Sequence, residues 1–288
     1  MAVFNLGSIN IDHFYGVDHL PKPGETLTAN SYSRDVGGKG ANQSIAVAWA
    51  GGLVHHIGAV GIDGDWVLEK LEALGISTSL IARLDCPTGH AIINVEPGGE
   101  NAIVVHGSAN TALGPSQVLA GLNGSRPGDF LLLQNETNLV QYAAEQARLR
   151  GLQVVYSAAP FASKAVAGML PLIDILALNQ GEAAQLTSAG IGGNELSEIG
   201  VLVTKGSKGA EFRRGGVSIS VAAHKVSAVD STGAGDTFLG FFAAGLDGGM
   251  SVENAMRQAA AAAAIQVTRH GTATAIPTLA EVTAFLTK

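Results

Sequence analysis

Short apolar runs alternate with amphipathic stretches along most of the chain. The amphipathic stretches repeat at helical spacing, as in Leu139, Val140, Ala143, Ala144 and Ala147. The apolar runs are typical of strands buried on both faces of a sheet, and they cover residues 2–9, 54–60, 130–133, 154–156, 173–178 and 201–204. Strand and helix in repetition predict an α/β fold, with a mostly parallel central sheet flanked by helices.

Two regions depart from this alternation. Residues 25–36 and 90–106 are β-type runs, and the second contains the turn EPGGE between two apolar strands. They predict a small β-sheet that projects from the main sheet as a lid. We expect residues 1–288 to form a single domain with a discontinuous lid from about 11–17, 25–36 and 88–107. The last third predicts three successive helices over residues 235–246, 251–267 and 279–286.

Composition narrows the class of protein. With 47% hydrophobic residues in 288, the chain has enough apolar material for a substantial core. Its 17 Lys and Arg against 24 Asp and Glu give a formal net charge of −7, and no basic run occurs. Because binding to a phosphate backbone needs clustered Lys and Arg, we expect no nucleic-acid partner.

The cysteine content and the length of the apolar segments indicate the cellular compartment. Cys86 is the one cysteine, so an internal disulfide is impossible and a reducing cytoplasm is expected. The first residues contain no basic segment ahead of an apolar one, and we expect no signal peptide. The longest uncharged apolar segments, 237–246 and 259–267, fall short of the roughly 20 residues of a membrane span. The sequence therefore predicts a cytoplasmic protein without a membrane segment.

A glycine turn that leads into an apolar helix carries the strongest chemical signal. Residues 230–238 read DSTGAGDTF. Successive N–H groups of such a turn at a helix N-terminus form a concave anion site, and Asp236 lies in the first helical turn beside it. Helix capping needs one carboxylate, whereas this segment supplies two, together with two glycines. The segment therefore favours a functional site over simple capping.

Two N-terminal features give weaker signals. Residues 37–42 read GGKGAN and open a helix. The three glycines let the backbone approach a ligand closely, and the N–H groups of the helix start are suited to a bound oxygen or anion. An ordinary tight turn is an equal alternative. Asp12 follows the first strand at its carboxyl end, where open parallel sheets bind ligands, but a carboxylate that caps a surface turn has the same pattern.

Two further motifs follow neighbouring strands. Asn179 and Glu182 come after the strand that ends at Leu178, and a capping box has the same spacing. Residues 204–209 read TKGSKG and predict a hairpin whose backbone can lie along phosphates, with an ordinary β-turn as the alternative. The pattern G-x-x-x-x-G-K-[ST] is absent and residues 58–64 do not fit G-x-G-x-x-G, so neither a P-loop nor a dinucleotide site is predicted.

In chain order, these motifs resemble the ribokinase family of carbohydrate kinases from end to end. The signature regions are residues 37–52 and 230–239, and the segments 7–13, 23–26, 108–113 and 267–271 are similar as well. The resemblance implies an ATP-dependent sugar kinase that transfers the γ-phosphoryl group to a hydroxyl of a small sugar, with ribose as the first expectation. Such a transfer relies on positioning, on neutralised charge and on a base that accepts the hydroxyl proton.

The resemblance also implies roles for single residues. The sugar-binding positions are Asp12, Gly38, Lys39, Asn42, Glu136 and Asp236, with Ala91, Ile93 and Val105 on the apolar side of the lid. The ATP-binding positions are Asn179, Glu182, Thr204, Gly206, Ser207 and Gly235, and Glu182 holds Mg²⁺ through water. The anion hole is formed by Gly233, Ala234 and Gly235, and the catalytic base is Asp236.

A monovalent-cation site is implied too. It is largely backbone, it binds K⁺, and it is formed by Asp230, Thr232, Gln266, Arg269 and Gly271. Ala275 stands where the family commonly has a serine near the end of this loop. Ala260 falls near a position that often carries a polar residue beside adenine, which leaves the choice between ATP and GTP open.

Other functions fit parts of the pattern. A kinase for fructose, deoxyribose or a nucleoside has the same motifs, although a nucleoside kinase calls for aromatic residues in the lid, and residues 25–36 and 90–106 offer only Tyr32. A catalytically silent sugar-binding regulator is a second alternative, against which intact Asp236 and Glu182 argue. Apolar residues at 91–95 and 102–105 leave strand surface that a small isolated layer does not bury, so we expect a homodimer joined through the lid.

Overall fold

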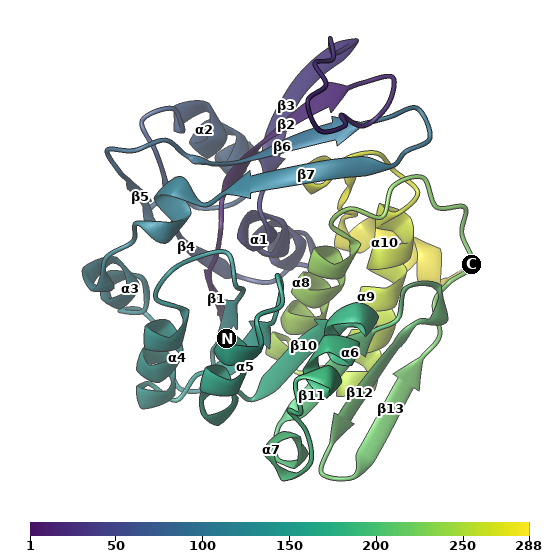
Figure 1. The fold of residues 1–288 in the computed structure, drawn as a ribbon. Helices are drawn as coiled ribbons and strands as arrows, with labels where there is room; N and C mark the ends of the chain where they lie inside the picture. Colours follow the sequence, from purple (N-terminus) through teal and green to yellow (C-terminus); the bar gives the residue numbers. More distant parts are fainter. Residues whose placement is uncertain (288) are drawn as a thin grey trace.

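A nine-stranded sheet runs through the molecule in the computed structural model, which describes residues 1–287 (Figure 1). Its strands are β1 (Val3–Leu6), β4 (Val54–Val60), β5 (Ile81–Arg83), β8 (Phe130–Leu133), β9 (Gln153–Ser157), β10 (Ile175–Asn179), β11 (Gly200–Thr204), β12 (Ala210–Arg214) and β13 (Val217–Val221). They lie in the order β13-β12-β11-β10-β9-β8-β1-β4-β5. All pairs from β5 to β11 are parallel, and β12 and β13 continue the sheet antiparallel. The predicted mostly parallel sheet is confirmed.

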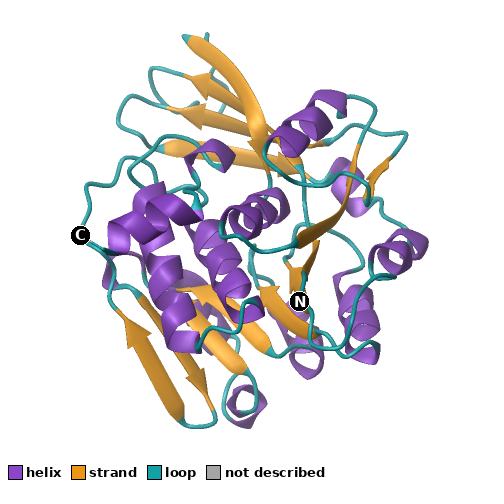
Figure 2. Ribbon diagram, turned by 180° about the vertical axis from the view of Figure 1, so that it is seen from behind, coloured by secondary structure: helices purple, strands orange, loops and turns teal. Residues whose placement is uncertain are grey.

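Helices cover both faces of this sheet (Figures 1 and 2). Because successive strand residues point to opposite faces, Val3 and Leu132 belong to one core, and Phe4 and Leu131 to the other. The first core is covered by α1 (Lys39–Trp49), α2 (Asp65–Ala73), α8 (Ala234–Asp247), α9 (Val252–Gln266) and α10 (Leu279–Leu286). The second is covered by α3 (Pro115–Gly121), α4 (Val140–Leu149), α5 (Ser163–Met169) and α6 (Gln180–Ser188), with the short α7 (Asn194–Ser197) beyond them.

A second sheet projects from the first as the predicted lid, seen at the top of Figure 1. Its strands are β2 (Asn10–Gly16), β3 (Ser31–Gly37), β6 (Gly89–Val95) and β7 (Asn101–His106), in the order β3-β2-β6-β7. The chain passes from β1 into β2 through only Gly7, Ser8 and Ile9. Asn110 fixes this passage, because its side chain bonds both the N–H and the C=O of Ile9 at 2.9 and 3.1 Å.

One boundary of the lid differs from the prediction. Residues 25–30 form no strand, and β3 begins only at Ser31. The segment ahead of it turns instead, since Glu25 N–H donates to the Lys22 carbonyl at 3.0 Å and the Glu25 carboxylate accepts from Lys22 N–H at 3.0 Å. The apolar pattern at the start of this run therefore belongs to a loop that precedes the strand.

The last third of the chain forms the three predicted helices α8, α9 and α10. The alanine run of α9 is almost entirely buried, and a Cβ placed on Gly245 of α8 would lie 2.9 Å from the Cβ of Ala255. The small side chains thus let the two helices approach closely. Among residues 1–287, no helix is long and apolar enough to cross a membrane.

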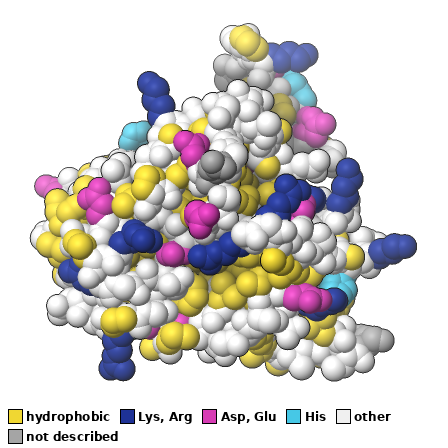
Figure 3. Space-filling view, turned by 90° about the horizontal axis from the view of Figure 1, so that it is seen from below, with side chains coloured by type: hydrophobic (Ala, Val, Ile, Leu, Met, Phe, Trp, Pro, Cys, Tyr) yellow, Lys and Arg dark blue, Asp and Glu magenta, His cyan; other side chains and the backbone are white. Residues whose placement is uncertain are grey.

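On the face drawn in Figure 3, basic and acidic side chains lie interspersed, with apolar atoms exposed between them. The lid has exposed apolar side chains on its edge strand β7, where Ile103, Val104 and Val105 are 47%, 68% and 53% exposed.

Candidate active site

The start of α8 fixes Asp236 at the centre of the molecule. Gly233 precedes the helix with φ 77°, a left-handed conformation that suits glycine, and Ala234, Gly235 and Asp236 form the first turn. The first N–H groups of a helix have no helical partner, so this end offers donors to an anion. Ala234 N–H also reaches back to the Ser231 carbonyl at 3.3 Å. The predicted anion-binding segment therefore has the predicted local structure.

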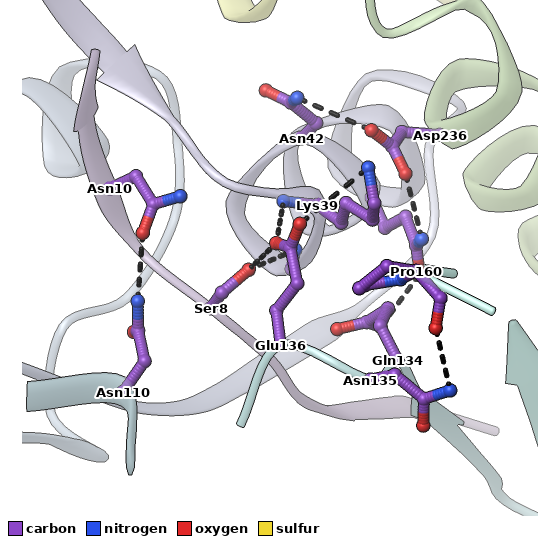
Figure 4. Close-up of polar contacts among 12 residues, drawn as sticks. Ser8, Asn10, Lys39, Asn42, Asn110, Gln134, Asn135, Glu136, Pro160 and Asp236 are labelled. Carbon is purple, nitrogen blue, oxygen red and sulfur yellow. Dashed lines mark hydrogen bonds and ion pairs between the residues drawn. The ribbon is translucent and has the colours of Figure 1, made fainter. Parts of the chain in front are cut away.

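Two amides from α1 hold the carboxylate of Asp236. Gln43 Nε2 donates to Oδ1 at 2.9 Å. Asn42 Nδ2 donates to Oδ2 at 3.4 Å (Figure 4). Burial raises the pKa of Asp236, while the Lys39 ammonium and these two amides oppose the rise. A carboxylate held in this way keeps both its orientation and an increased proton affinity, which are the properties of a general base.

Lys39 and Glu136 form a second polar cluster next to Asp236. Glu136 Oε2 accepts from Ser8 Oγ at 2.5 Å and from Lys39 N–H at 3.1 Å, and Oε1 lies 3.6 Å from Lys39 Nζ (Figure 4). Asp236 and, to a smaller extent, Glu136 raise the pKa of Lys39 against the effect of burial. Lys39 is therefore a fixed cation between the two carboxylates.

A cavity of about 170 Å³ opens beside these groups. Its wall includes Lys39, Glu182, Thr204, Gly235 and Asp236. Residues from distant parts of the chain meet here because β10 and β11 end at the same edge of the sheet, where Asn179 and Thr204 are register partners, and α8 begins opposite them. The sequence motifs at 179–182 and 230–236 thus contribute to one cavity.

Asn179 and Glu182 form the capping box that was the alternative in the sequence. Glu182 N–H donates to Asn179 Oδ1 at 2.9 Å, and Asn179 N–H donates to Glu182 Oε2 at 2.7 Å. Both residues still line the cavity, and burial raises the pKa of Glu182. Among residues 1–287, no cluster of three or more His, Cys, Asp or Glu is arranged for a metal ion. The arrangement suits Mg²⁺ that keeps its waters and rests on nucleotide phosphates, since such sites need only one or two carboxylates.

The hairpin at 204–209 is present, between β11 and β12. Thr204 lines the cavity, whereas Gly206 and Ser207 form an exposed 3₁₀ turn (Gly206–Lys208) outside its wall. The expected contact of Gly206 and Ser207 with a nucleotide therefore stays a prediction.

Asp12 lies on the face of the lid that is turned toward the main sheet. It is 6% exposed, and burial, helped by Glu136 and Asp35, raises its pKa to about 7. Ala91 and Ile93, on the neighbouring strand, are 4% and 6% exposed. Val105 is 53% exposed because β7 is an edge strand, so only two of the three predicted apolar lid positions are buried.

The glycine-rich segment at 37–42 has more than one role. Gly38 precedes α1, while Gly40 packs against the backbone where β1 ends: a Cβ on Gly40 would lie 2.4 Å from Gly7 Cα and from Ser8 N. Gly40 therefore serves the approach of α1 to the sheet. The sequence interpretation, in which all three glycines approach a ligand, is too broad at this position.

Sequence reasoning missed four polar residues that organise the site. Ser8 and Gln43 bond Glu136 and Asp236 directly, Gln134 donates to Gln43 Oε1 at 2.7 Å, and Asn110 fixes the base of the lid. Ser8 and Gln43 stand within or beside motifs already singled out. Gln134 follows a predicted strand at its carboxyl end, a position that marks it as a candidate.

The family is shown by a comparison with family models. The model described as pfkB family carbohydrate kinase matches residues 2–279. The chain belongs to this family of carbohydrate kinases and is a sugar phosphotransferase. The predicted class of enzyme is confirmed.

Individual relatives narrow the resemblance. The chain is 38% identical to the ribokinase of Haemophilus influenzae over 298 residues, which covers 98% of this chain and 97% of the relative. It is 30% identical to the deoxyribokinase of Salmonella typhimurium, over 99% of each chain. Among solved structures, the ribokinase of Arabidopsis thaliana, complexed with ribose and ATP, is similar with a TM-score of 0.87 and 28% identity over 100% of each chain. These matches confirm the predicted fold class, projecting lid included.

Proposed function

We propose that this chain is an ATP-dependent ribose kinase. The position of Asp236 carries the proposal: a carboxylate of raised proton affinity stands in the first turn of α8, on the wall of a cavity shared with Lys39 and Glu182. Ribose as the acceptor is supported by the ribokinases at 35–38% identity and by the ribokinase solved with ribose and ATP.

In the proposed reaction, the sugar lies between the lid and α1. Asp12 accepts hydrogen bonds from sugar hydroxyls, and Lys39 and Asn42 contact others. Asp236 orients the reacting hydroxyl and takes its proton. The sugar oxygen forms a bond to the γ-phosphorus as the bond from that phosphorus to the bridging oxygen of ADP breaks. The N–H groups at the start of α8 stabilise the charge on the transferred group.

The nucleotide is proposed to enter from the side of β10 and β11, along Thr204 and the exposed turn at Gly206 and Ser207. Mg²⁺ would supply charge neutralisation on the phosphates when bound, and Glu182 is the residue that would hold it through water. The capping hydrogen bonds between Asn179 and Glu182 keep this carboxylate turned to the cavity. A cytoplasmic location remains a prediction from the sequence.

A coupled assay of ADP release tests the acceptor. The panel contains ribose, 2-deoxyribose, fructose, adenosine and inosine, with ATP in the presence of Mg²⁺. We expect kcat/KM to be highest for ribose by about tenfold or more, the discrimination that one changed pocket contact provides. A higher kcat/KM for deoxyribose or for a nucleoside would contradict the proposal. Turnover of none of these acceptors would favour a silent regulator.

Sugar affinity is expected to depend on pH through Asp12. Its pKa in the free protein is about 7, and the charged form is the better acceptor, so binding must first remove a proton at lower pH. From about pH 8 to pH 6, the Kd for ribose should rise about tenfold, and the Kd for nucleotide should change little. Calorimetric titration measures both.

Asp12→Asn is the control for this prediction. The variant should bind ribose weakly, with a Kd that no longer varies over this range. If its slope equals that of the wild type, the dependence arises from another group, such as Asp236, and the assignment to Asp12 is wrong.

We also propose a homodimer joined through the lid. Ile103, Val104 and Val105 expose apolar surface on an edge strand, a surface that pairing with a second copy would cover. Light scattering at micromolar concentration should give about twice the 29.3 kDa of one chain. Val104→Lys should yield monomers, because it places a charge on that edge. A wild-type monomer at this concentration would contradict the proposal.

A further inference from the structure

Gln266, the last residue of α9, is fully buried behind the glycine turn of the active site. Its side-chain nitrogen Nε2 lies 3.2 Å from the Thr232 carbonyl oxygen, 3.2 Å from that of Thr272 and 3.4 Å from that of Gly271. Three backbone carbonyls from two separate loops therefore converge on one amide group.

The chemistry of the neighbours fixes the orientation of this amide. Carbonyl oxygens only accept hydrogen bonds, so the NH₂ end must face them. On the other side, Oε1 accepts from Thr237 Oγ1 at 3.2 Å, and Thr237 is also fully buried. The reversed orientation would press an amide oxygen against three carbonyl oxygens without a proton between them.

Converging backbone carbonyls are the ligands that bind a potassium ion elsewhere in proteins. The family resemblance leads to the same expectation here, with Asp230, Thr232, Gln266, Arg269 and Gly271 around the ion, largely through backbone groups. In this chain, however, Nε2 of Gln266 lies where these carbonyls converge, and an ion at that point would overlap it. The residues present do not fit a bound cation.

The charged neighbours agree with this conclusion. Both carboxylate oxygens of Asp230 are engaged by backbone N–H groups, of Thr232 at 2.9 Å and of Gly271 at 3.2 Å. Arg269 donates to the carbonyl of Ala275 at 3.4 Å, at the position where the family commonly has a serine. The Asp230 carboxylate therefore already has donors of its own, and the Arg269 guanidinium is paired with the Glu281 carboxylate at 2.5 Å.

The amide also touches the catalytic segment. A Cβ placed on Gly233 would lie 3.4 Å from Gln266 Nε2. Gly233 precedes α8 and with it Gly235 and Asp236. Gln266 thus joins the turn at 230–233, the loop at 271–272 and the first turn of α8 through four hydrogen bonds.

We propose that the side-chain amide of Gln266 replaces a monovalent cation in ordering the anion-binding turn, so that this kinase does not depend on K⁺. Gln266 is then a positioning residue: it acts on Gly235 and Asp236 through the turn and touches no substrate. The inference rests on the kinase activity, but not on which sugar is the acceptor.

The wild-type enzyme provides the first test. Turnover is measured at roughly 100 mM KCl and in tetramethylammonium chloride of equal ionic strength, with the best acceptor of the panel. We expect rates equal within about twofold and a melting temperature that KCl does not change relative to tetramethylammonium chloride. Stimulation by K⁺ of about fivefold or more would overturn the proposal.

Two substitutions provide the second test. Gln266→Ala removes the amide and leaves the carbonyls facing a space that an ion can enter. In tetramethylammonium its kcat should fall about tenfold or more, and KCl should restore kcat and raise the melting temperature. Gln266→Met removes the same hydrogen bonds but fills the space, so KCl should restore neither. A Gln266→Ala enzyme that K⁺ does not rescue would contradict the proposal.

Gln258→Ala is the matched control, since Gln258 is a second buried glutamine of α9, about two helical turns away. It should show no K⁺ dependence of turnover or of melting temperature. If Gln266→Ala does not fold, the wild-type comparison decides alone. The melting-temperature measurements need no substrate. They can therefore contradict the inference about Gln266 independently of whether the protein phosphorylates ribose.

Discussion

Asp236→Asn is expected to lower kcat by about 10²- to 10⁴-fold, the range of general-base contributions. Asparagine retains the size of the side chain and accepts a hydrogen bond from Gln43 as the carboxylate does, but it does not accept the proton of the sugar hydroxyl. Since the chemical step alone is impaired, KM for the sugar and for ATP should change by less than about threefold. Steady-state kinetics with both substrates varied measure these constants.

Melting temperatures separate this role from helix capping. The Asn variant should melt close to the wild type, because it removes a charge that burial disfavours at the cost of a charge pairing with Lys39. A capping role gives the opposite pattern, with near-normal turnover in Asp236→Asn and a loss of about 1 kcal/mol of stability in Asp236→Ala. Half of the wild-type turnover in the Asn variant would end the assignment of Asp236 as the base.

Gly40→Ala is expected to destabilise the folded protein strongly. The added Cβ would lie 2.4 Å from Gly7 Cα, Gly7 C and Ser8 N, all backbone atoms that no change of rotamer can move. To relieve the contact, α1 must move away from β1 and take Asn42 and Gln43 away from Asp236. We expect a loss of about 3 kcal/mol or more, and a melting temperature lower by roughly 5 °C or more.

Gly235→Ala is the same substitution as Gly40→Ala, made at a glycine of the active site. A Cβ at this position has no atom of the described chain within 4 Å, and it projects where the cavity wall is open. Alanine is also the better helix former by about 1 kcal/mol, so the melting temperature should be unchanged or higher. Turnover should nevertheless fall about tenfold or more, because the methyl group narrows the anion site. Equal melting temperatures for the two variants would contradict the roles assigned to the two glycines.

The fold was largely predictable because its signals are local. Apolar runs with helical spacing between them give a parallel sheet, and the carboxyl ends of such strands meet at one edge. This rule places the strand ends at Asn179 and Thr204 side by side, as the structure has them, whereas the position of Asp236 opposite them depends on where α8 begins. The error at residues 25–30 has a local origin as well, since the turn made by Lys22 and Glu25 interrupts a pattern that otherwise favours a strand.

The contacts within the site join residues that are far apart in the chain, so local sequence patterns do not predict them. The hydrogen bond from Ser8 to Glu136 joins residues 128 positions apart. The position of Gln266 requires the end of α9 to meet two loops and the start of α8, so a motif comparison finds only a candidate cation ligand there. The search for lid aromatics covered residues 25–36 and 90–106 and found only Tyr32. It omitted Phe14 of the lid strand β2, which lies on the same face of that strand as Asp12.

Three carboxylates, of Glu136, Glu182 and Asp236, surround the single ammonium of Lys39. Before any ligand arrives, the cavity therefore has an excess of negative charge. The negative charge of the cavity repels a free polyphosphate. A polyphosphate with a divalent ion attached carries less negative charge, so it is repelled far less. We therefore expect the pocket to favour the metal–nucleotide complex over free nucleotide, because a bound divalent ion would lower the electrostatic barrier to entry.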